Sequence, residues 1–561
     1  MRGHVLWAVA CSALCAGGLQ AQTEDGPPPL TISGNTQLLW QSYAEDDRIG
    51  AVVPPSKTGL NAFGNVIATS GNFSAGLRFE SYLGAVVGFP GRYRGTGIGY
   101  RFARWADPER GVDVTLGNFY EQFGSGILLR SYEERALGID NALDGIRLIL
   151  TPIPGVQVKA LTGVQRLDFD SRLINGEGIV RAVDGTVELN ALRESWDAAL
   201  TRVTLGGSFV SRFQPSSPLV RDTLVLAVPQ NVGAWSYRLD LQRGGWSGGL
   251  EYAVKINDPN ADNGYIYKRG EALLANLGYT RRGLGILVSA KTVDNMSFRS
   301  DRDLKLFDLP INYIPAITKQ HTYNLAATLY PYATVLFGES SASAEVFYQF
   351  PKNSRIGGPY GTKVTLNVAA ANGLDTLQLT GVDGAVYGYE RVGWGFGPEK
   401  YVRDINVQLD RRLSEKLRAK YTYFYLEFNT LATPVTTSYK GLVYADIHVL
   451  EAQLATREGQ TLRAEFQQLT TAQDKGDWAT VLAEYTWSPH WFVSVLDQYN
   501  YGNPDPDARV HYLYGAVGYV DGPHRLSVGY GKRREGIFCI GGVCRAVPAS
   551  NGFEVNFTTS F

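Results

Sequence analysis

The chain has 561 residues, and its 53 lysines and arginines nearly balance its 54 aspartates and glutamates. This balance provides neither a basic face for nucleic acid nor an acidic tail, so we expect no nucleic-acid partner. Glycine (63), tyrosine (32) and tryptophan (10) are frequent and methionine (2) is rare. Such a composition favours turns and aromatic-rich strands over helical cores, and it predicts an all-β protein.

The first 21 residues have the pattern of a secretory signal peptide. Arg2 precedes an apolar stretch over 5–16, and small residues follow up to Ala21. We expect cleavage near Ala21, then a short lead over 22–29 and a single domain over 30–561. No later stretch approaches the ~18 to 20 consecutive apolar residues of a membrane helix. The mature chain is therefore not expected to be a helical membrane protein.

Apolar and polar residues alternate with a period of two over many segments of the remaining chain. In 417–425, for example, Leu417, Ala419 and Tyr421 share one face of a strand, and polar side chains take the other. The same pattern recurs in 237–242, 250–256, 344–350, 402–410, 462–467 and 525–531. A soluble sandwich would alternate too, so the period alone does not separate it from a barrel.

The connectors between these segments favour the barrel. Short connectors occur at 152–155, 243–247, 280–283, 412–415, 456–460, 487–490 and 520–524. Long polar connectors separate them, at 167–183, 257–268, 295–320, 351–400 and 534–549. Short turns on one side and long loops on the other are typical of bacterial outer-membrane proteins. We therefore predict a transmembrane antiparallel up-and-down β-barrel of about 24 strands (roughly 22–26), with the short turns in the periplasm.

The last segment, 553–561, alternates up to a terminal phenylalanine. It resembles the closing strand of outer-membrane proteins, which the barrel-assembly machinery recognises. The resemblance implies that Phe557 and Phe561 form an assembly signal and that this machinery is a partner. It also implies outer-membrane lipid around the barrel and a location in the outer membrane of a Gram-negative bacterium.

A barrel of this size has a lumen that side chains alone cannot fill. The alternation places charges of both signs on the predicted lumen wall, namely Arg238, Asp240, Glu251, Lys255, Asp404, Arg418, Lys420, Arg463 and Glu465. The mixture predicts a wetted wall without strong ion selectivity. The alternative is that these charges only pair across neighbouring strands.

The connector 122–147 is unusually rich in charge, and it carries Arg130, Glu133, Glu134, Arg135, Asp140 and Asp144. If this segment folds into the lumen, these residues would form a constriction of the pore. The alternative is an ordinary external loop that is capped by its own ion pairs.

Cys539 and Cys544 are the only cysteines beyond the predicted signal peptide. An exported chain can keep so close a pair oxidised, so we predict a local disulfide that stiffens a surface loop and contributes ~2 kcal/mol. Free thiols, a metal site and a redox-switched lid are the alternatives. A zinc site would need about four ligands, and no histidine or second cysteine pair lies nearby, so we expect no metal.

Three segments, 129–147, 401–409 and 541–545, resemble the signal-peptide-bearing outer-membrane barrels of Bacteroidota that form a family of unknown function. The resemblance would cover nearly the whole mature chain. It implies the fold and the location, and it implies no activity.

Histidines are few, and the sequence contains no nucleophile elbow, HExxH motif or P-loop. We therefore expect neither catalysis nor a cofactor. About eight residues separate the signal from Leu30, too few for the plug domain of an active transporter, although a separate plug or partner protein stays open. The sequence predicts a porin-like channel for small solutes. The alternative is a structural or docking barrel, closed by loops or by a partner protein, in secretion or envelope assembly.

Overall fold

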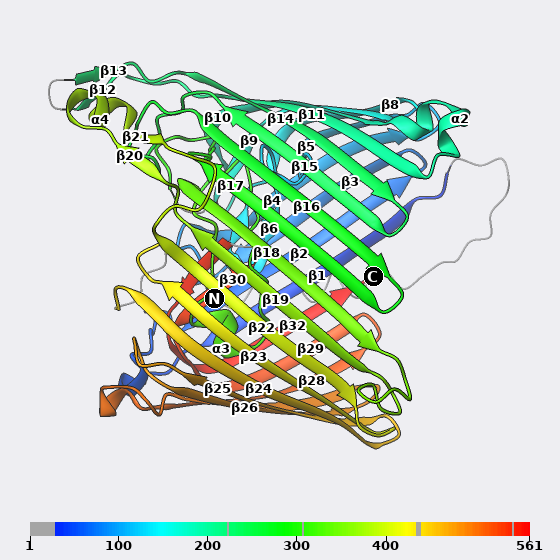
Figure 1. The fold of residues 1–561 in the computed structure, drawn as a ribbon, viewed down its shortest axis with the longest axis vertical. Helices are drawn as coiled ribbons and strands as arrows, with labels where there is room; N and C mark the ends of the chain where they lie inside the picture. The colour runs from blue at the N-terminus through cyan, green and yellow to red at the C-terminus, as the bar shows by residue number, and fades with distance from the viewer. Residues whose placement is uncertain (1–27, 222–223, 306–307, 433–438, 541–542) are drawn as a thin grey trace.

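The computed structural model describes residues 28–221, 224–305, 308–432, 439–540 and 543–561 (Figure 1). Twenty-four strands form one closed antiparallel sheet, in which each strand pairs with the next along the chain and β1 pairs with β32. No helix in this part of the chain is long and apolar enough to cross a membrane. The predicted up-and-down barrel and its strand number are confirmed.

The wall strands, in order around the barrel, are β1 (Thr31–Ser42), β2 (Thr58–Ser70), β3 (Phe73–Tyr82), β4 (Tyr93–Asp107), β5 (Val112–Phe119), β8 (Leu143–Ile153), β9 (Val156–Asp170), β10 (Leu173–Glu188), β11 (Thr201–Phe213), β14 (Asn231–Arg243), β15 (Trp246–Lys255), β16 (Gly270–Arg281), β17 (Leu284–Asp294), β18 (Gly338–Phe350), β19 (Thr362–Asn372), β22 (Lys400–Arg412), β23 (Leu417–Asn429), β24 (Leu442–Arg457), β25 (Gln460–Thr470), β26 (Trp478–Trp487), β27 (Trp491–Tyr499), β28 (His511–Asp521), β29 (His524–Arg533) and β32 (Ser550–Ser560).

The connections carry the smaller elements. These are α2 (Glu194–Asp197), α3 (Asn324–Thr328), α4 (Gly381–Tyr387), the hairpins β6 (Glu133–Glu134) with β7 (Ile139–Asp140), β12 (Leu219–Arg221) with β13 (Leu224–Leu226), β20 (Thr376–Gln378) with β21 (Tyr389–Arg391) and β30 (Gly536–Ile540) with β31 (Val543–Val547), and the 3-10 turns η2 (Asp47–Ile49), η3 (Arg135–Leu137), η4 (Leu189–Leu192) and η5 (Pro506–Ala508).

The two ends of the barrel differ, as the connectors predict. Tight turns such as those joining β8 to β9 and β14 to β15 lie at one end, on the right of Figure 1, which we call the short-turn end. The elements α4, β12, β13, β20 and β21 lie at the opposite, long-loop end. Two predicted connectors are wrong. Residues 167–183 lie mostly in β9 and β10, and 351–400 contains β19, because strands extend through polar sequence there.

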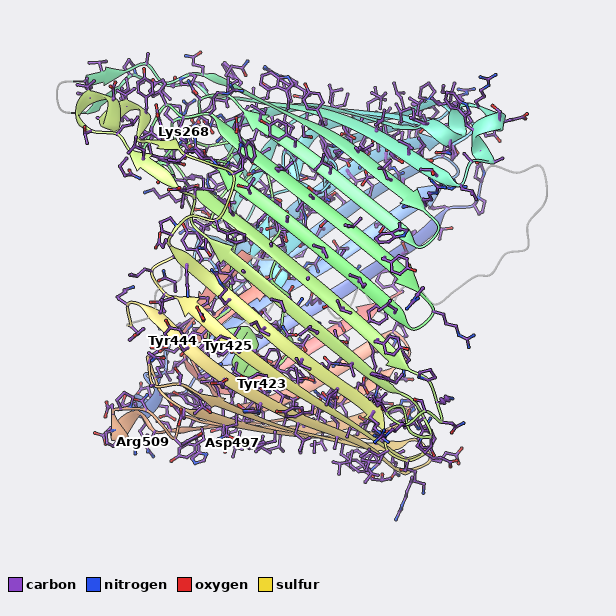
Figure 2. The ribbon with its side chains drawn as sticks, viewed as in Figure 1. Lys268, Tyr423, Tyr425, Tyr444, Asp497 and Arg509 are labelled. Carbon is purple, nitrogen blue, oxygen red and sulfur yellow. The ribbon has the colours of Figure 1, made fainter. Side chains whose placement is uncertain are left out.

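Apolar and aromatic side chains cover the outside of the barrel. Large outward-facing residues such as Leu77, Leu116, Tyr237, Leu250 and Val517 are each more than two-fifths exposed. Tyrosines join them on β23 and β24, where Figure 2 labels Tyr423, Tyr425 and Tyr444. An outward apolar band with aromatic residues is the surface that a lipid bilayer requires of a membrane barrel.

Inward-facing side chains change character along the strands. On β14, Val232 and Ala234 near the long-loop end are fully buried, and Arg238 and Asp240 follow toward the short-turn end. β24 repeats this change, with the buried row Val443, Ala445, Ile447 and Val449 before Glu451. Apolar side chains stabilise a fold only when other protein atoms bury them away from water. The apolar half of the inner wall must therefore be covered by another part of the chain.

That cover enters through a break in the strand pairing. β5 ends at Phe119 and β8 begins at Leu143, and beyond them β4 and β9 meet directly in a short parallel pairing of Tyr93 with Phe169 and Arg94 with Asp170. The chain between β5 and β8 therefore leaves the wall, and it lies inside the barrel.

Candidate functional site in the barrel lumen

Residues 120–142 form the first inner loop, which lies against the apolar half of the wall. Its side chains Phe123, Ile127, Leu128 and Leu129 are each only 1% exposed. They share one hydrophobic cluster with the inward-facing residues Val210, Val232, Ala253 and Val293 of four wall strands. The sequence left open whether this segment is external, and the structure places it in the lumen.

The tip of the first inner loop touches the wall at β14 and β15. The backbone N–H of Ser125 donates to Oε2 of Glu251 at 3.0 Å. Gly124 has φ +52°, and a Cβ at this position would come within 2.4 Å of the Arg238 Cδ atom. Only glycine combines that backbone conformation with so close an approach.

The other end of the first inner loop is held by a buried ion cluster of Arg78 and Glu80 from β3, Arg166 from β9 and Asp140 from the loop. Arg166 donates from Nη1 to Glu80 Oε1 and from Nη2 to Glu80 Oε2, both at 2.7 Å. Its Nη1 also lies 2.9 Å from Asp140 Oδ2, and Arg78 pairs with the same carboxylate. None of the four side chains is more than 7% exposed.

The charge balance in this cluster favours the ionised form of Asp140. Burial alone would raise the pKa of its carboxyl, but Arg166 and Arg78 outweigh burial and lower the pKa below its ordinary value. The hydroxyl of Tyr120 donates to Asp140 Oδ1 at 2.9 Å. Asp140 is thus a negatively charged tether between the loop and two strands of the wall.

The remaining predicted constriction residues lie in different surroundings. The Arg130 guanidinium lies over the rings of Tyr132 and Tyr313, with centroid distances of 4.8 and 4.0 Å. Glu133 accepts hydrogen bonds from Arg78 at 2.9 Å and from Arg135 at 2.7 Å.

Glu134 and Asp144 take no part in the buried ion cluster. Glu134 accepts from the backbone N–H of Ala136 at 3.3 Å and thereby caps the turn that follows. Asp144 lies on β8, on the same face as the exposed Ile146, and Arg101 reaches it at 3.3 Å. The alternation of β8 turns Asp144 away from the lumen, so its assignment to the constriction is wrong.

Residues 295–305 and 308–337, between β17 and β18, form a second inner loop. The sequence predicts only a long polar connector over 295–320, on the long-loop side of the barrel. The two inner loops bind each other: the Arg130 N–H donates to the Ile311 carbonyl and the Tyr313 N–H to the Gly126 carbonyl, both at 2.9 Å. Met296, Phe298, Ile311 and Ile314 of the second loop complete the cluster around the first.

The second inner loop continues to the opposite part of the wall. Leu325 of α3 is fully buried in a cluster with inward-facing residues of β23 and β24, and its N–H donates to Oε1 of Gln467 on β25 at 3.0 Å. His321 Nε2 lies 2.5 Å from Asp404 Oδ2 of β22. Arg534, just after β29, donates to Asn324 Oδ1 at 3.1 Å and to Thr328. Together the two loops bridge the lumen from β3 to β29.

Most charges of the predicted lumen wall have partners, although only the pairs of Arg418, Lys420 and Arg463 include one across neighbouring strands, as the pairing alternative supposes. Besides that of Asp404, the pairs are Arg238 with Asp184 (2.5 Å), Lys255 with Asp258 (3.0 Å), Arg418 with Asp410 (2.6 Å), Lys420 with Glu451 (3.3 Å), and Arg463 with Glu465 (2.5 Å) and Glu484. Asp240 and Glu251 differ, since neither forms an ion pair with another described residue.

A cavity of about 440 Å³ lies at the wall beside the tip of the first inner loop. Arg238, Asp240, Glu251, Lys159 and Asn276 line it, together with Gln122 and Ser125 of the loop. Within the described residues, no group of three or more histidine, cysteine, aspartate or glutamate side chains could hold a metal ion.

Two sets of predicted residues lie at other places. The backbones of Cys539 and Cys544 are directly opposite each other in the β30–β31 hairpin, but their side chains lie outside the described structure, so the disulfide stays a prediction. The backbone N–H and carbonyl of Phe561 bond to Gly34 of β1, both at 2.9 Å, and continue the β1–β32 pairing. The assembly role of Phe557 and Phe561 stays a prediction too.

A family model matches the whole chain, from residue 1 to residue 561. The chain belongs to DUF6029, a family of unknown function. No curated protein matches the sequence of this DUF6029 member.

Solved structures with similar barrels include the P pilus usher (PapC) translocation pore, at 10% identity over 95% of this chain and 99% of that chain, with a TM-score of 0.43. The siderophore receptor PirA from Pseudomonas aeruginosa matches at 12% identity over 96% and 81%, with a TM-score of 0.39. The outer membrane protein OpdK from the same organism matches at 10% identity over 82% and 97%, with a TM-score of 0.36.

Proposed function

We propose that this DUF6029 protein is an outer-membrane channel for small polar solutes, narrowed from within by its two inner loops. The observation that carries the proposal is the division of the inner wall. Its apolar half is covered by the loops, and its polar half, with Arg238, Asp240 and Glu251, borders a cavity of about 440 Å³. A wall built only for support has no need of a polar, hollowed half.

The proposed location follows from the outer surface and from the first residues. The apolar band of the barrel suits a bilayer, and the predicted signal over 1–21 would direct the chain out of the cytoplasm. We place the short-turn end in the periplasm and the long-loop end outside a Gram-negative cell. We also propose a Bacteroidota source, on the strength of the sequence resemblance.

Reconstitution of the folded barrel into planar bilayers tests this function. Folding is checked first by heat-modifiable migration in gels. The channel proposal predicts stepwise conductance of uniform size, with currents below those expected for an unobstructed lumen of this strand number. A folded barrel that stays electrically silent would overturn the proposal.

One observation favours a second candidate, a docking barrel that its own loops keep closed. The side chains Phe123, Leu129 and Leu325 are as buried as those of a soluble protein core, so the bridge across the lumen is a packed structure. Such a barrel would open only for a partner protein. A silent barrel in the bilayer experiment would favour this role over the channel.

A further inference from the structure

The cavity beside the first inner loop has two carboxylates, of Glu251 and Asp240, that form no ion pair within the part of the chain that the structure describes. Glu251 is only 6% exposed, and its Oε2 accepts one hydrogen bond, from the N–H of Ser125. Its Oε1 is buried and has no hydrogen-bond partner among the described residues. A buried carboxylate oxygen without a hydrogen-bond donor destabilises a folded protein, so its retention at a cavity indicates an occupant that supplies the donor.

The cations around the cavity are already neutralised. Arg238 pairs with Asp184 at 2.5 Å and also donates to the Ser208 hydroxyl at 2.6 Å. Lys159 pairs with Glu121 of the first inner loop at 2.8 Å. The lining residues therefore carry an excess of negative charge, which comes from Glu251 and Asp240.

The strand register places the carboxylates of Asp240 and Glu251 next to the open space at Gly249. Asp240 on β14 is opposite Gly249 on β15, and Gly249 is in turn opposite Asn276 on β16. Glu251 lies two residues beyond Gly249, so it faces the same side of the sheet. A side chain at position 249 would meet the Asp240 carboxylate at 3.0 Å, so glycine keeps the space between Asp240 and Asn276 open.

We propose that this cavity binds a small organic cation through an ammonium group, which donates hydrogen bonds to Glu251 Oε1 and to the Asp240 carboxylate. An ammonium group has three donors and the complementary charge. The amides of Asn276 and Gln122 offer polar contacts to the rest of the solute. A metal ion fits less well, because no three histidine, cysteine, aspartate or glutamate side chains among the described residues are placed to hold one, and the third lining carboxylate, Asp184, pairs with Arg238.

The inference rests on the proposed channel function, because it makes the cavity a selective binding site for solutes that pass through the pore. It specifies the solutes as cationic. The predicted lack of strong ion selectivity would then hold for the paired parts of the wall and not for this cavity.

Isothermal titration calorimetry on the detergent-solubilised full-length barrel tests the inference with three four-carbon probes. Putrescine carries ammonium groups, succinate carries carboxylates, and 1,4-butanediol is neutral. We expect saturable binding of putrescine alone. Equal binding of succinate or butanediol, or no binding of putrescine, would overturn the proposal.

Two variants identify the site. Glu251→Gln and Asp240→Asn keep the shape of each side chain and remove its charge, and each should weaken putrescine binding by about tenfold or more. Asp410→Asn is the matched control, because it removes a wall carboxylate that pairs with Arg418 outside the cavity. Unchanged affinity in both cavity variants, or an equal loss in the control, would refute the assignment.

The calorimetry and the bilayer experiment can fail separately. Conductance without putrescine binding would leave the channel standing and remove the cation site. Binding in a barrel that conducts nothing would remove the channel, and with it the interpretation of the cavity as a binding site for solutes that pass through the pore.

Discussion

Arg166 on β9 donates hydrogen bonds to both carboxylate oxygens of Glu80 on β3, each at 2.7 Å, although β4, β5 and β8 lie between these strands in the wall. The contact is possible because the pairing of β5 with β8 ends at Phe119 and Leu143, before the long-loop end. Beyond that point β4 pairs directly with β9, which brings β9 close to β3. The buried ion cluster therefore fastens the break in the wall through which the first inner loop enters.

Breaking this contact should cost much of the barrel's stability. Glu80→Gln leaves the buried Arg166 with one carboxylate partner, that of Asp140, which it shares with Arg78. We expect the free energy of unfolding to fall by about 3–5 kcal/mol. Urea unfolding in lipid vesicles measures the loss. Asp410→Asn, which breaks a pair whose Arg418 side chain is 57% exposed, should cost at most about 1 kcal/mol. Equal losses in the two variants would refute the role of the cluster.

The loop tether should respond to acid in one direction. The pKa of Asp140 is lowered in the folded barrel, so its ion pairs contribute fully at neutral pH and are lost as the pH falls through that lowered pKa, below about pH 4. We expect conductance to stay constant between about pH 7 and pH 5 and to rise only below about pH 4. Asp140→Asn should show the high conductance already at neutral pH. A rise near pH 6 in the wild type would point to a different group.

Gly124 tests how tightly the loop tip seals against the wall. An alanine at this position would be strained by the positive φ, and its Cβ would clash with the Arg238 side chain. Gly124→Ala should therefore destabilise the barrel by about 2–4 kcal/mol and increase the conductance, because the loop tip must move away from the wall. Gly244→Ala is the matched control, because Gly244 has a similar φ of +56° with no atom within 4 Å of the added Cβ. It should cost about 1–2 kcal/mol and leave the conductance unchanged. Equal conductance in the two variants would contradict the contact.

Arg534 should hold the far end of the second inner loop. Burial lowers the pKa of its guanidinium to about 10, which leaves it charged at neutral pH, and it lies over the Trp478 ring while it donates to Asn324. Arg534→Ala should expose the loop and speed tryptic cleavage at Lys319 about tenfold. Arg525→Ala, which removes a guanidinium that lies over Phe492 of the wall, serves as the control. Cleavage at an equal rate in both variants would argue against this role.

The sequence predicts the wall well because a strand's two faces and its tight turns are local properties. The alternation in 417–425 coincides with β23, and the connector 243–247 contains the turn between β14 and β15. Strand number follows from the same local signals. Residues 167–183 were misjudged because strands that extend past the membrane need no apolar face, so their polar residues resemble a loop.

The inner loops could be predicted only in part, since their positions depend on contacts between residues far apart in the chain. The charge of 122–147 marked the first loop, but its partners Arg78 and Arg166 carry no local sign of that contact. A usable signal for the second loop is the inward row Val443, Ala445, Ile447 and Val449. An apolar row on the inner face of a barrel strand indicates that something covers it, and here α3 does.

Single-channel conductance of a loop-deleted barrel shows whether the inner loops narrow a pore. Deletion of 128–142 removes most of the first inner loop, including the buried Leu128 and Leu129 and the tether Asp140. Deletion of 381–387 removes only α4 at the long-loop end. With both proteins shown to be folded by heat-modifiable migration, we predict larger conductance steps for the first deletion and wild-type steps for the second. Steps of wild-type size after the first deletion would show that the first inner loop does not narrow a pore.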